Sequence, residues 1–218
     1  MTTTTQPWQL MPEQLFAAGP IVPVLVINDV ADAIPIASAL LDAGIRLLEV
    51  TLRTPSALEV IRTIAQTFPE AIVGAGTVTN AETLQQAEDA GAKFAISPGL
   101  TKDLLVAGKE GNIALIPGIS SISELMDGID CGYDHFKFFP AEASGGVNAI
   151  KSIGGPFPNI KFCPTGGINI NNIKNYLALP NVACCGGSWL VSDAIIADKN
   201  WPKITQLAKE ALALVSQK

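Results

Sequence analysis

Short apolar runs alternate with longer amphipathic segments along most of the chain. Eight of these runs are five to seven residues long and are bounded by polar or glycine-containing stretches. Such runs are typical of strands buried on both faces, as in a parallel sheet. The predicted strands are Ile21–Ile27, Arg46–Leu52, Ala71–Gly76, Lys93–Ser97, Ile113–Pro117, His135–Phe139, Ile160–Pro164 and Val182–Gly186.

The segments between the predicted strands carry apolar residues at helical spacing. Ala81–Ala90 is one example, in which Asn80 is suited to cap the start and Gly91 to end the helix. Ser121–Asp130 and Pro202–Val215 have similar patterns. The order of elements is therefore strand, helix, strand, helix.

Eight strand–helix units with short loops predict an α/β fold, a single-domain (β/α)₈ TIM barrel over residues 1–218. An open, doubly wound sheet is the main alternative. That fold usually has a G-x-G-x-x-G motif after its first strand, whereas the first predicted strand here ends in Ile27-Asn28-Asp29. No linker or low-complexity segment divides the chain, and residues 1–5 are expected to be disordered.

Composition narrows the class of protein. Hydrophobic residues make up 48% of the chain and charged residues 16%, which favours one sizeable core over a disordered chain. A net charge of −6 without a basic cluster argues against a nucleic-acid partner. The apolar runs are shorter than the roughly 20 residues needed to span a membrane, so no membrane partner is expected.

The cysteines and the N-terminal residues indicate the cellular compartment of the protein. Cys131, Cys163, Cys184 and Cys185 form no C-x-x-C pair, which favours reduced thiols over a zinc site or a disulfide framework. The segment MTTTTQPWQL lacks the basic and apolar regions of a signal peptide. We therefore expect a cytoplasmic protein.

One predicted strand places a lysine among aromatic residues. With a two-residue period, Lys137 points into the barrel with His135 and Phe139, while Phe136 and Phe138 pack against helices. Burial disfavours the ammonium and favours the free amine, which can attack a ketone carbon. The alternative is a lysine that extends along the strand or only neutralises a buried carboxylate.

A carboxylate and an arginine occur on the second predicted strand and at its exit. Glu49 shares the inward face with Leu47 and Thr51, and a carboxylate there requires a partner. Arg53 follows directly, so a structural Glu49–Arg53 ion pair is one possibility. Because barrel enzymes place their chemistry at the carboxyl ends of strands, we instead interpret Glu49 as an acid–base group and Arg53 as a ligand for a substrate carboxylate.

Threonine and glycine residues end three other predicted strands. Thr77 is expected to contribute a hydroxyl hydrogen bond to the substrate, and Thr165 ends the seventh predicted strand beside Gly166 and Gly167. Glycine loops after the seventh and eighth strands are where barrels bind phosphate through backbone N–H groups and a helix N-terminus, although tight turns also use Gly-Gly. The predicted phosphate ligands are Gly166, Gly167, Gly187 and Ser188.

The remaining strand ends suggest no metal or cofactor. Ser97-Pro98-Gly99 and Pro117-Gly118 are interpreted as rigid turns that shape the mouth. His135 is the only histidine, and a zinc site normally needs several N or S ligands. We expect His135 to be packed in the core toward the barrel floor, and we expect neither a metal site nor a cofactor.

These groups suggest one reaction class. Attack of Lys137 on a 2-keto group gives an iminium ion, which accepts electrons when the C3–C4 bond breaks. Glu49 is the candidate to take the C4 hydroxyl proton. Arg53 would bind the carboxylate, and the glycine loops would hold a distal phosphate. The predicted substrate is a phosphorylated 2-keto acid that is cleaved to pyruvate.

The order of these motifs resembles the KDPG/KHG aldolase family, which acts on 2-keto-3-deoxy-6-phosphogluconate and 4-hydroxy-2-oxoglutarate. The resemblance runs from about Leu15 to Val215. The matching segments are Glu-Val-Thr-Leu-Arg-Thr at 49–54, Val-Gly-Ala-Gly-Thr-Val at 73–78, Phe-Ala-Ile-Ser-Pro-Gly at 94–99, Ile-Pro-Gly-Ile-Ser at 116–120, Phe-Lys-Phe-Phe-Pro-Ala-Glu at 136–142, Phe-Cys-Pro-Thr-Gly-Gly-Ile at 162–168 and Gly-Gly-Ser-Trp-Leu at 186–190.

The resemblance implies roles for individual residues. Lys137 is the expected Schiff-base lysine and Glu49 the general acid/base. The implied substrate contacts are Arg53, Thr77, Pro98, Phe139 and Thr165, and the implied phosphate contacts are Gly166, Gly167, Gly187 and Ser188. The resemblance further implies a metal-free, cytoplasmic homotrimer in the Entner–Doudoroff pathway.

Two other functions stay open. A phosphate-binding barrel that isomerises or decarboxylates its substrate would need Lys137 only as a charge. A non-catalytic sugar-phosphate-binding barrel would need neither Lys137 nor Glu49. Within the aldolase reading, the sequence does not decide among gluconate-derived, galactonate-derived and 4-hydroxy-2-oxoglutarate substrates.

Overall fold

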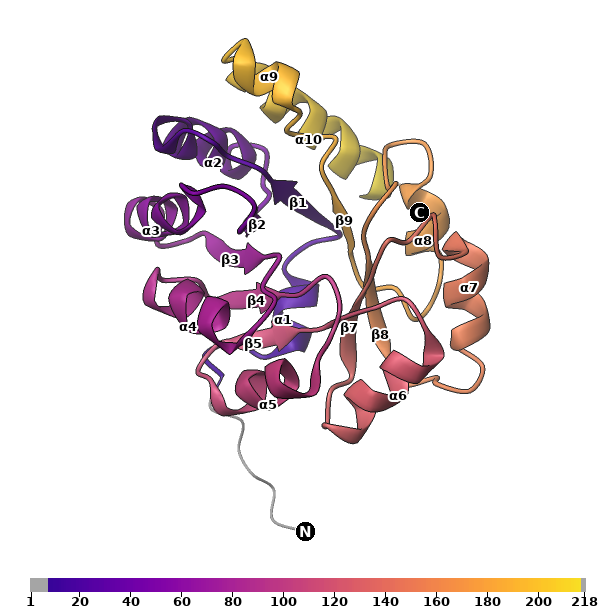
Figure 1. Cartoon of the computed structure of the whole chain (residues 1–218). Coiled ribbons are helices and arrows are strands. Elements are labelled where there is room, and N and C mark those ends of the chain that lie inside the picture. The colour runs from indigo at the N-terminus through magenta and orange to yellow at the C-terminus, as the bar shows by residue number, and fades with distance from the viewer. Residues whose placement is uncertain (1–7, 217–218) are drawn as a thin grey trace.

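The computed structural model describes residues 8–216 of the 218-residue chain, so the disorder expected for residues 1–5 lies outside the described residues (Figure 1). The strands are β1 (Ile21–Leu25), β2 (Leu47–Thr51), β3 (Ile72–Gly76), β4 (Phe94–Ile96), β5 (Ala114–Ile116), β6 (Gly118–Ile119), β7 (His135–Phe138), β8 (Lys161–Pro164) and β9 (Cys185–Gly187). The helices are α1 (Pro12–Ala17), the 3₁₀ helix η1 (Val30–Asp32), α2 (Ala33–Leu41), α3 (Ala57–Thr67), α4 (Ala81–Asp89), α5 (Lys102–Glu110), α6 (Ile122–Asp130), α7 (Gly146–Ile153), α8 (Ile173–Leu177), α9 (Asp193–Ala197) and α10 (Trp201–Ser216).

The strands form a parallel α/β fold with two sheets. The larger sheet has the order β5-β4-β3-β2-β1-β9, and the smaller one has the order β6-β7-β8. Each ladder between strands is parallel. Neighbours in the order are mostly consecutive in the sequence, as expected when a helix returns the chain to the next strand in the same direction.

The fifth predicted strand is divided at Pro117. β5 pairs with β4, whereas β6 begins one residue after Pro117 and pairs with β7. Proline has no N–H to donate to a ladder, so it favours such an interruption. Ser97 ties the two parts together, because its N donates a hydrogen bond to Ile116 O at 3.2 Å and its buried hydroxyl accepts one from Gly118 N at 3.1 Å.

The last predicted strand begins later than the sequence suggests. β9 starts at Cys185, while Val182 takes part only in an isolated parallel bridge with Phe162. A second bridge joins Thr165 to Gly186, so the smaller sheet meets the larger one along β8 and β9. The glycines that follow the apolar run continue the pairing, because Gly187 is in register with Pro23 of β1.

Helices lie outside the strands, and α1 lies behind them in Figure 1. Phe136 contacts α6 so closely that a Cβ at Gly128 would come within 2.4 Å of its ring. At the start of β7, the ring of Phe16 from α1 meets His135 edge-on, with 5.0 Å between the ring centroids. Phe136 therefore packs outward and His135 packs toward the floor, as the alternation of the strand predicts.

The helix signals in the sequence are confirmed at their starts. Asn80 accepts a hydrogen bond from Thr83 N at 2.8 Å, and α4 ends before Gly91, whose φ of 91° suits glycine. Ser121 caps α6 and accepts a hydrogen bond from Glu124 N at 3.3 Å. α10 matches the predicted terminal helix within one residue at each end.

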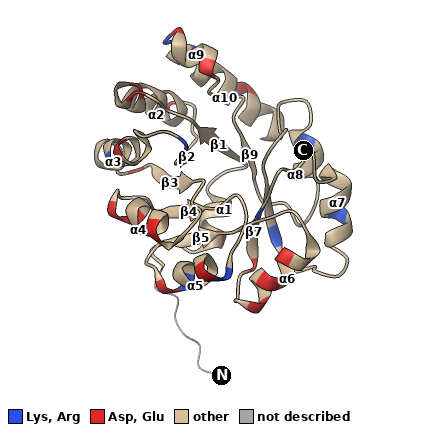
Figure 2. Cartoon of the chain, viewed as in Figure 1, with Lys and Arg blue, Asp and Glu red and all other residues tan. Residues whose placement is uncertain are grey.

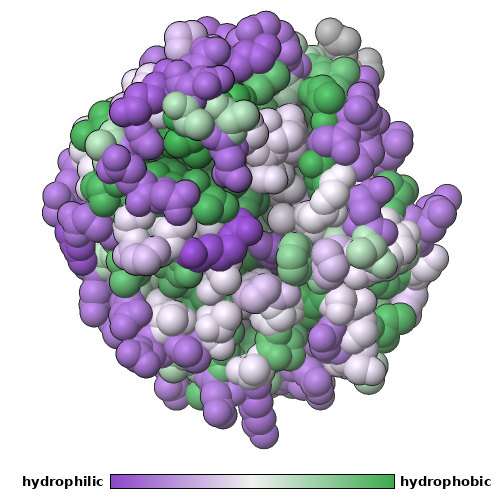
Figure 3. Space-filling view, turned by 45° about the horizontal axis from the view of Figure 1, so that its top comes forward, coloured by the Kyte–Doolittle hydropathy of each residue, from purple (hydrophilic) through white to green (hydrophobic). Residues whose placement is uncertain are grey.

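The outer surface is polar around its rim. Figure 3 shows hydrophilic residues around much of the edge of the visible face, and mostly white and green residues with a strongly hydrophilic side chain near its centre. Within residues 8–216, no helix combines the length and the apolar character needed to cross a membrane. The four cysteines are free thiols, as expected from their spacing.

Glu124 offers a test of the α6 cap. Its carboxylate accepts hydrogen bonds from the backbone N–H groups of Ser120 and Ser121, both at 2.8 Å. Burial alone would raise the pKa of Glu124, but these hydrogen bonds outweigh it and lower the pKa below its usual value. The stabilisation is therefore complete above the unfolded-state pKa of about 4.3 and is lost as the pH falls through the lower folded-state value.

We expect Glu124→Ala to lower the free energy of unfolding by about 0.5–1 kcal/mol near neutral pH, with the difference shrinking in acid. Urea denaturation over a range of pH measures both effects. Glu124→Gln is the control, because it keeps an oxygen acceptor but does not ionise. An equally steep pH dependence in Glu124→Gln would contradict the assignment.

Candidate active site

The residues singled out in the sequence lie at or just beyond the carboxyl ends of the parallel strands. Since parallel strands end on the same side of a sheet, these residues share one end of the fold. β2 supplies Glu49 and is followed by Arg53; Thr77 follows β3, Pro98 follows β4, β7 supplies Lys137 and is followed by Phe139, Thr165 to Gly167 follow β8, and Gly187 and Ser188 end or follow β9.

A buried ion pair lies at the centre of this end. Lys137 Nζ donates a hydrogen bond to Glu49 Oε1 at 3.3 Å. The side chains are 7% and 1% exposed, so both charges are largely removed from water. A buried pair of charges carries a large desolvation cost and is a weak device for stability, which favours a chemical role for the pair.

The residues around the Lys137–Glu49 pair leave space for the carboxylate and lie close to the ammonium. A Cβ on Gly76 of β3 would lie 2.2 Å from Glu49 Oε1, so glycine is the residue that admits the carboxylate. On the other side, Lys137 Nζ is 5.1 Å from the ring centroid of Phe139, a cation–π distance. Glycine at position 76 and phenylalanine at 139 therefore define the walls around the pair.

Arg53 is held by the strand that carries Glu49. Its Nε donates a hydrogen bond to Thr51 Oγ1 at 3.1 Å, and the Thr51 hydroxyl donates to Leu25 O at 2.8 Å. Both Glu49 and Arg53 lie in the described part of the chain, and the structural ion pair between them is not formed. Arg53 is exposed, and among residues 8–216 its guanidinium forms no ion pair with a carboxylate.

The loop after Arg53 is also fixed. The hydroxyl groups of Thr54 and Ser56 both donate to Ile27 O, at 2.8 and 2.9 Å. The Ile27 carbonyl, in the loop after β1, thus fixes the loop after β2 at the carboxyl ends of the strands. The contact of Thr54 with Ile27 places Thr54 among the residues that fix the mouth.

Thr77 adopts a backbone conformation that is unusual for threonine. Its φ is 60°, in the left-handed region where a β-branched residue is strained. Such strain is often found where a side chain must be held in a functional position. Thr77 is half-buried. It directly follows Gly76, which lies beside the Glu49 carboxylate.

Pro98 lies against Gly118, the residue of β6 that pairs with Lys137. A Cβ on Gly118 would be 2.5 Å from the carbonyl group of Pro98, and Gly118 is the register partner of Lys137. The predicted turn therefore covers the strand next to the ion pair. This close approach of two backbones explains glycine at position 118.

The loop after β8 has the conformation expected of consecutive glycines. Gly166 and Gly167 have φ values of 99° and 80°, which other residues adopt only with strain. Gly166 O accepts a hydrogen bond from Glu142 N at 3.1 Å. Gly167 O accepts from Asn172 Nδ2 at 2.9 Å and from Asn169 Nδ2 at 3.2 Å.

Sequence reasoning did not single out the supports of this loop. The Tyr176 hydroxyl donates a hydrogen bond to the Glu142 carboxylate, and a Cβ on Gly167 would be 2.5 Å from Glu142 Cγ. Burial, followed by the contact with Glu142, raises the pKa of Tyr176. The asparagines after the Gly-Gly pair were the available signal, because asparagine side chains often bond to backbone in turns.

The second glycine loop differs in one respect from the expectation. Gly187 ends β9, and a Cβ there would clash with the Trp189 ring. A helix was expected directly after Ser188, but α9 begins at Asp193 and its first turn is capped by Ser192. The chain turns at Ser188 to Val191 before α9, so a helix N-terminus does not directly follow the loop.

Thr165 connects the two loops. Its side chain is buried, and a Cβ at Gly186 would be 2.3 Å from Thr165 Oγ1. Thr165 also bridges to Gly186 through the backbone. The two glycine loops therefore follow adjacent strands.

Two buried cysteines lie on the strand next to β7 and in the segment that follows it. Cys163 is in register with Lys137 on the neighbouring strand. A hydrogen bond with Cys163, together with burial, raises the pKa of Cys184. A protonated, buried thiol is a poor nucleophile, which is consistent with a packing role for Cys184.

His135 lies at the opposite end of β7 from the mouth. Its Nδ1 is 2.7 Å from Asp134 Oδ1, and this hydrogen bond lowers the pKa of Asp134. The ligand atoms of Glu13, Asp134 and His135 lie within 4.8 Å of one another. Within residues 8–216 this is the one group of three such residues, and it is remote from the Lys137–Glu49 pair by its place at the strand start.

Known proteins match the chain over most of its length. Residues 13–207 match the family model described as KDPG and KHG aldolase. A protein from Pseudoalteromonas atlantica named 2-dehydro-3-deoxy-phosphogluconate aldolase is 64% identical over 96% of this chain and 97% of its own. A KHG/KDPG aldolase from Escherichia coli K12 is 54% identical over 94% of this chain and 96% of its own.

A solved structure shares the fold as well. KDPG aldolase from Legionella pneumophila, with pyruvate captured at low pH as a covalent carbinolamine intermediate, has a TM-score of 0.93 and 52% identity. The similarity covers 94% of this chain and 100% of that one. The matched family model and the extent of these identities show that this chain belongs to the KDPG and KHG aldolase family.

Proposed function

We propose that this protein is a class I aldolase that cleaves 2-dehydro-3-deoxy-6-phosphogluconate to pyruvate and glyceraldehyde 3-phosphate. The observation that carries the proposal is the buried contact of 3.3 Å between Lys137 Nζ and Glu49 Oε1. The pyruvate carbinolamine of the Legionella relative supports a covalent route through a lysine. The name KHG/KDPG aldolase of the Escherichia coli relative supports cleavage of 4-hydroxy-2-oxoglutarate to pyruvate and glyoxylate as a second activity.

The reaction begins when Glu49 accepts a proton from the Lys137 ammonium. The free amine attacks C2 of the keto acid, and Glu49 returns the proton to the oxygen, which gives a carbinolamine. Loss of water from that carbon forms the iminium ion. Arg53 binds the substrate carboxylate, and the hydroxyl groups of Thr77 and Thr165 orient the reacting end.

Cleavage follows from the iminium ion. Glu49 takes the proton of the C4 hydroxyl, the C3–C4 bond breaks, and its electron pair flows to nitrogen to form an enamine and an aldehyde. C3 then takes a proton, and water releases pyruvate and restores the lysine. Phe139 packs beside Lys137, Pro98 covers the neighbouring strand at Gly118, and together they limit access of water to the intermediate.

The distal phosphate binds at Gly166, Gly167, Gly187 and Ser188. In the loop after β8, the carbonyl oxygens of Gly166 and Gly167 already accept hydrogen bonds from Glu142, Asn169 and Asn172. The peptide N–H groups of this loop are therefore the groups that would bind an anion. Backbone donors suit a chain with a net charge of −6, since no basic cluster is required. Binding there holds the keto end beside Lys137.

The assembly and the full architecture are part of the proposal. β5 and β6 continue one segment, and two bridges join β8 to the segment of β9, which supports a closed (β/α)₈ barrel. Ile122 and Met126, 47% and 54% exposed on one face of α6, support a homotrimer interface. We place the enzyme in the cytoplasm, in the Entner–Doudoroff pathway, with no metal or cofactor.

Lys137 provides the first test. Borohydride added with pyruvate is expected to attach one reduced pyruvyl group to Lys137, detected by peptide mass spectrometry. An unmodified Lys137 peptide would favour a barrel that uses the lysine only as a charge.

Two further measurements test the same mechanism. Pyruvate release that persists in Lys137→Ala would favour another catalytic group. Activity that is lost to a chelator would contradict the metal-free mechanism.

Glu49 is expected to act on proton transfer rather than on folding. Glu49→Gln keeps the size of the side chain and should lower kcat by about 10²–10⁴-fold with little change in thermal midpoint. Steady-state pyruvate release and thermal unfolding are the two measurements. A large fall in thermal midpoint at unchanged kcat would instead indicate a structural ion pair.

Gly76 tests the placement of the carboxylate. Gly76→Ala should displace Glu49 Oε1, which is 2.2 Å from the new methyl position, and lower kcat at least tenfold. Gly99→Ala is the matched control, because no atom lies within 4 Å of a Cβ there. Equal activity of the two variants would show that Glu49 does not need this position.

The phosphate loop predicts a difference between substrates. Ser188→Asp should raise KM for the phosphorylated substrate at least tenfold by like-charge repulsion. Cleavage of 4-hydroxy-2-oxoglutarate, which has no phosphate, should change much less. Comparable losses on both substrates would place Ser188 elsewhere in the reaction.

A further inference from the structure

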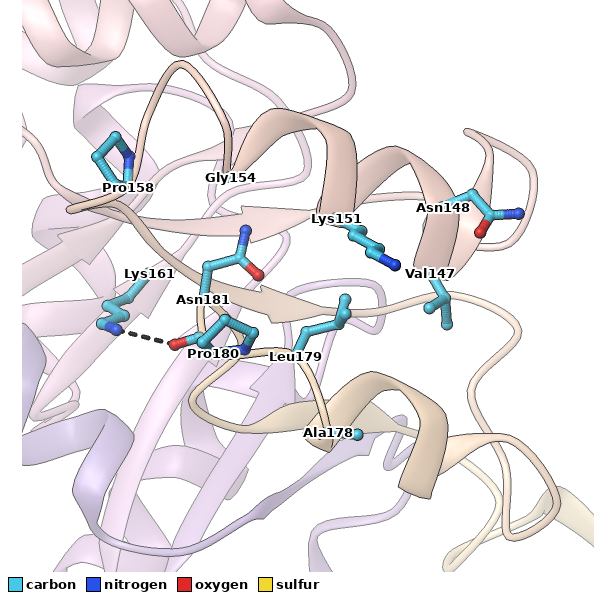
Figure 4. Close-up of a pocket in the computed structure, with 10 residues that line it drawn as sticks. All are labelled: Val147, Asn148, Lys151, Gly154, Pro158, Lys161, Ala178, Leu179, Pro180 and Asn181. Carbon is cyan, nitrogen blue, oxygen red and sulfur yellow. Dashed lines mark hydrogen bonds between the residues drawn. The ribbon is translucent and has the colours of Figure 1, made fainter.

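A groove separate from the strand ends lies between α7 and α8 (Figure 4). Its volume is about 600 Å³, within the range of small-molecule sites. Lys161 is the first residue of β8, and Asn181 precedes β9, so the groove opens near the start of the strands. Lys137 and Glu49 face the other end.

The segment that forms this groove is distinctive in charge. Residues 143–192 contain three lysines and neither aspartate nor glutamate, although the whole chain carries a net charge of −6. Figure 2 shows acidic residues on α4, α5 and α6 but only a basic residue on α7. The groove is therefore a locally cationic site on an acidic protein, which favours anions over cations.

Two lysines enter the groove from different sides. Figure 4 shows Lys161 beside Pro180 at one end and Lys151 toward the other, with Asn181 between them. Lys161 Nζ donates one hydrogen bond, to Pro180 O at 2.9 Å, which fixes its position and leaves two further N–H donors. Lys151 is exposed on α7, and none of the residues 8–216 that line the groove carries a carboxylate.

Asn181 adds a polar group that is held in a fixed position. The residue is 5% exposed, and its Nδ2 donates to Ile150 O at 2.9 Å, which holds the amide in place. The same hydrogen bond leaves the Oδ1 acceptor turned into the groove, where Figure 4 draws it. A ligand with a hydroxyl or N–H group between two anionic ends would satisfy this acceptor.

Apolar side chains form the rest of the wall. Val147 of α7 faces Leu179 and Pro180, which follow α8, while Pro158 closes the end near Lys161. Such a surface accepts the carbon chain of a small molecule between its charged ends.

We propose that this groove binds a small organic dianion, with one anionic end at Lys151 and the other at Lys161. The class includes dicarboxylates and phosphorylated carboxylates, which share two anionic ends on a short carbon chain. Binding here is distinct from the aldolase reaction and does not depend on it, because the catalytic groups lie at the opposite ends of the strands.

The test follows the methyl groups of Val147 and Leu179 by NMR in the full-length protein, with malate as dicarboxylate probe and 2-phosphoglycolate as phosphorylated probe. Saturable shifts of both methyl groups are expected at millimolar probe. Acetate, with a single anionic end, should bind at least tenfold more weakly. Whichever dianion binds more tightly identifies the source of the second anionic end.

Lys151→Glu should weaken dianion binding at least tenfold. Lys102→Glu on α5 is the matched control, since it makes the same charge change on an exposed residue outside the groove, and it should change binding less than twofold. Lys151 is exposed, so the variant is expected to fold. The proposal is overturned if neither dianion shifts the two methyl groups, if acetate binds equally well, or if the two variants weaken binding equally.

Discussion

The buried pair of Lys137 and Glu49 is the interaction around which the rest of the site is arranged. Two charges removed from water are costly, so the surrounding structure must hold them in register. Gly76 supplies the space for the carboxylate, and Phe139 lies 5.1 Å from the ammonium. The pair is thus kept together by residues from three different strands or strand ends, which is a placement that parallel topology provides without long loops.

The same geometry separates tasks along the strands. Charged and hydroxyl groups lie at the carboxyl ends, where loops can hold a substrate, whereas His135 and Phe16 close the other end as packing residues. The glycine loops after β8 and β9 complete the mouth through backbone groups rather than through positive side chains. Under the proposed function, this division explains how an acidic protein can be suited to an anionic substrate: fixed dipoles and Arg53 are assigned to binding, and Lys137 is assigned to the chemistry.

Sequence reasoning selected most residues of this candidate site because they interrupt a regular pattern. Lys137 and Glu49 are charges on faces that otherwise carry apolar residues, and Arg53 follows at a strand exit. Strand ends were less reliable: Pro117 divides one predicted strand into β5 and β6, and β9 begins three residues after the predicted start. These differences arise because hydrogen-bonded pairing depends on the neighbouring strand, while hydrophobicity is a property of the segment alone.

The sequence by itself determined the alternation of strands and helices, the inward position of Lys137 and Glu49, and the glycines needed for positive φ. Only the tertiary structure decided which charges pair. It joined Glu49 to Lys137 rather than to Arg53, placed Thr77 in a strained conformation, and supported the Gly167 carbonyl with Asn169 and Asn172. The reason is physical: periodicity fixes the face on which a side chain lies, whereas distances between residues far apart in the chain depend on how the strands pack.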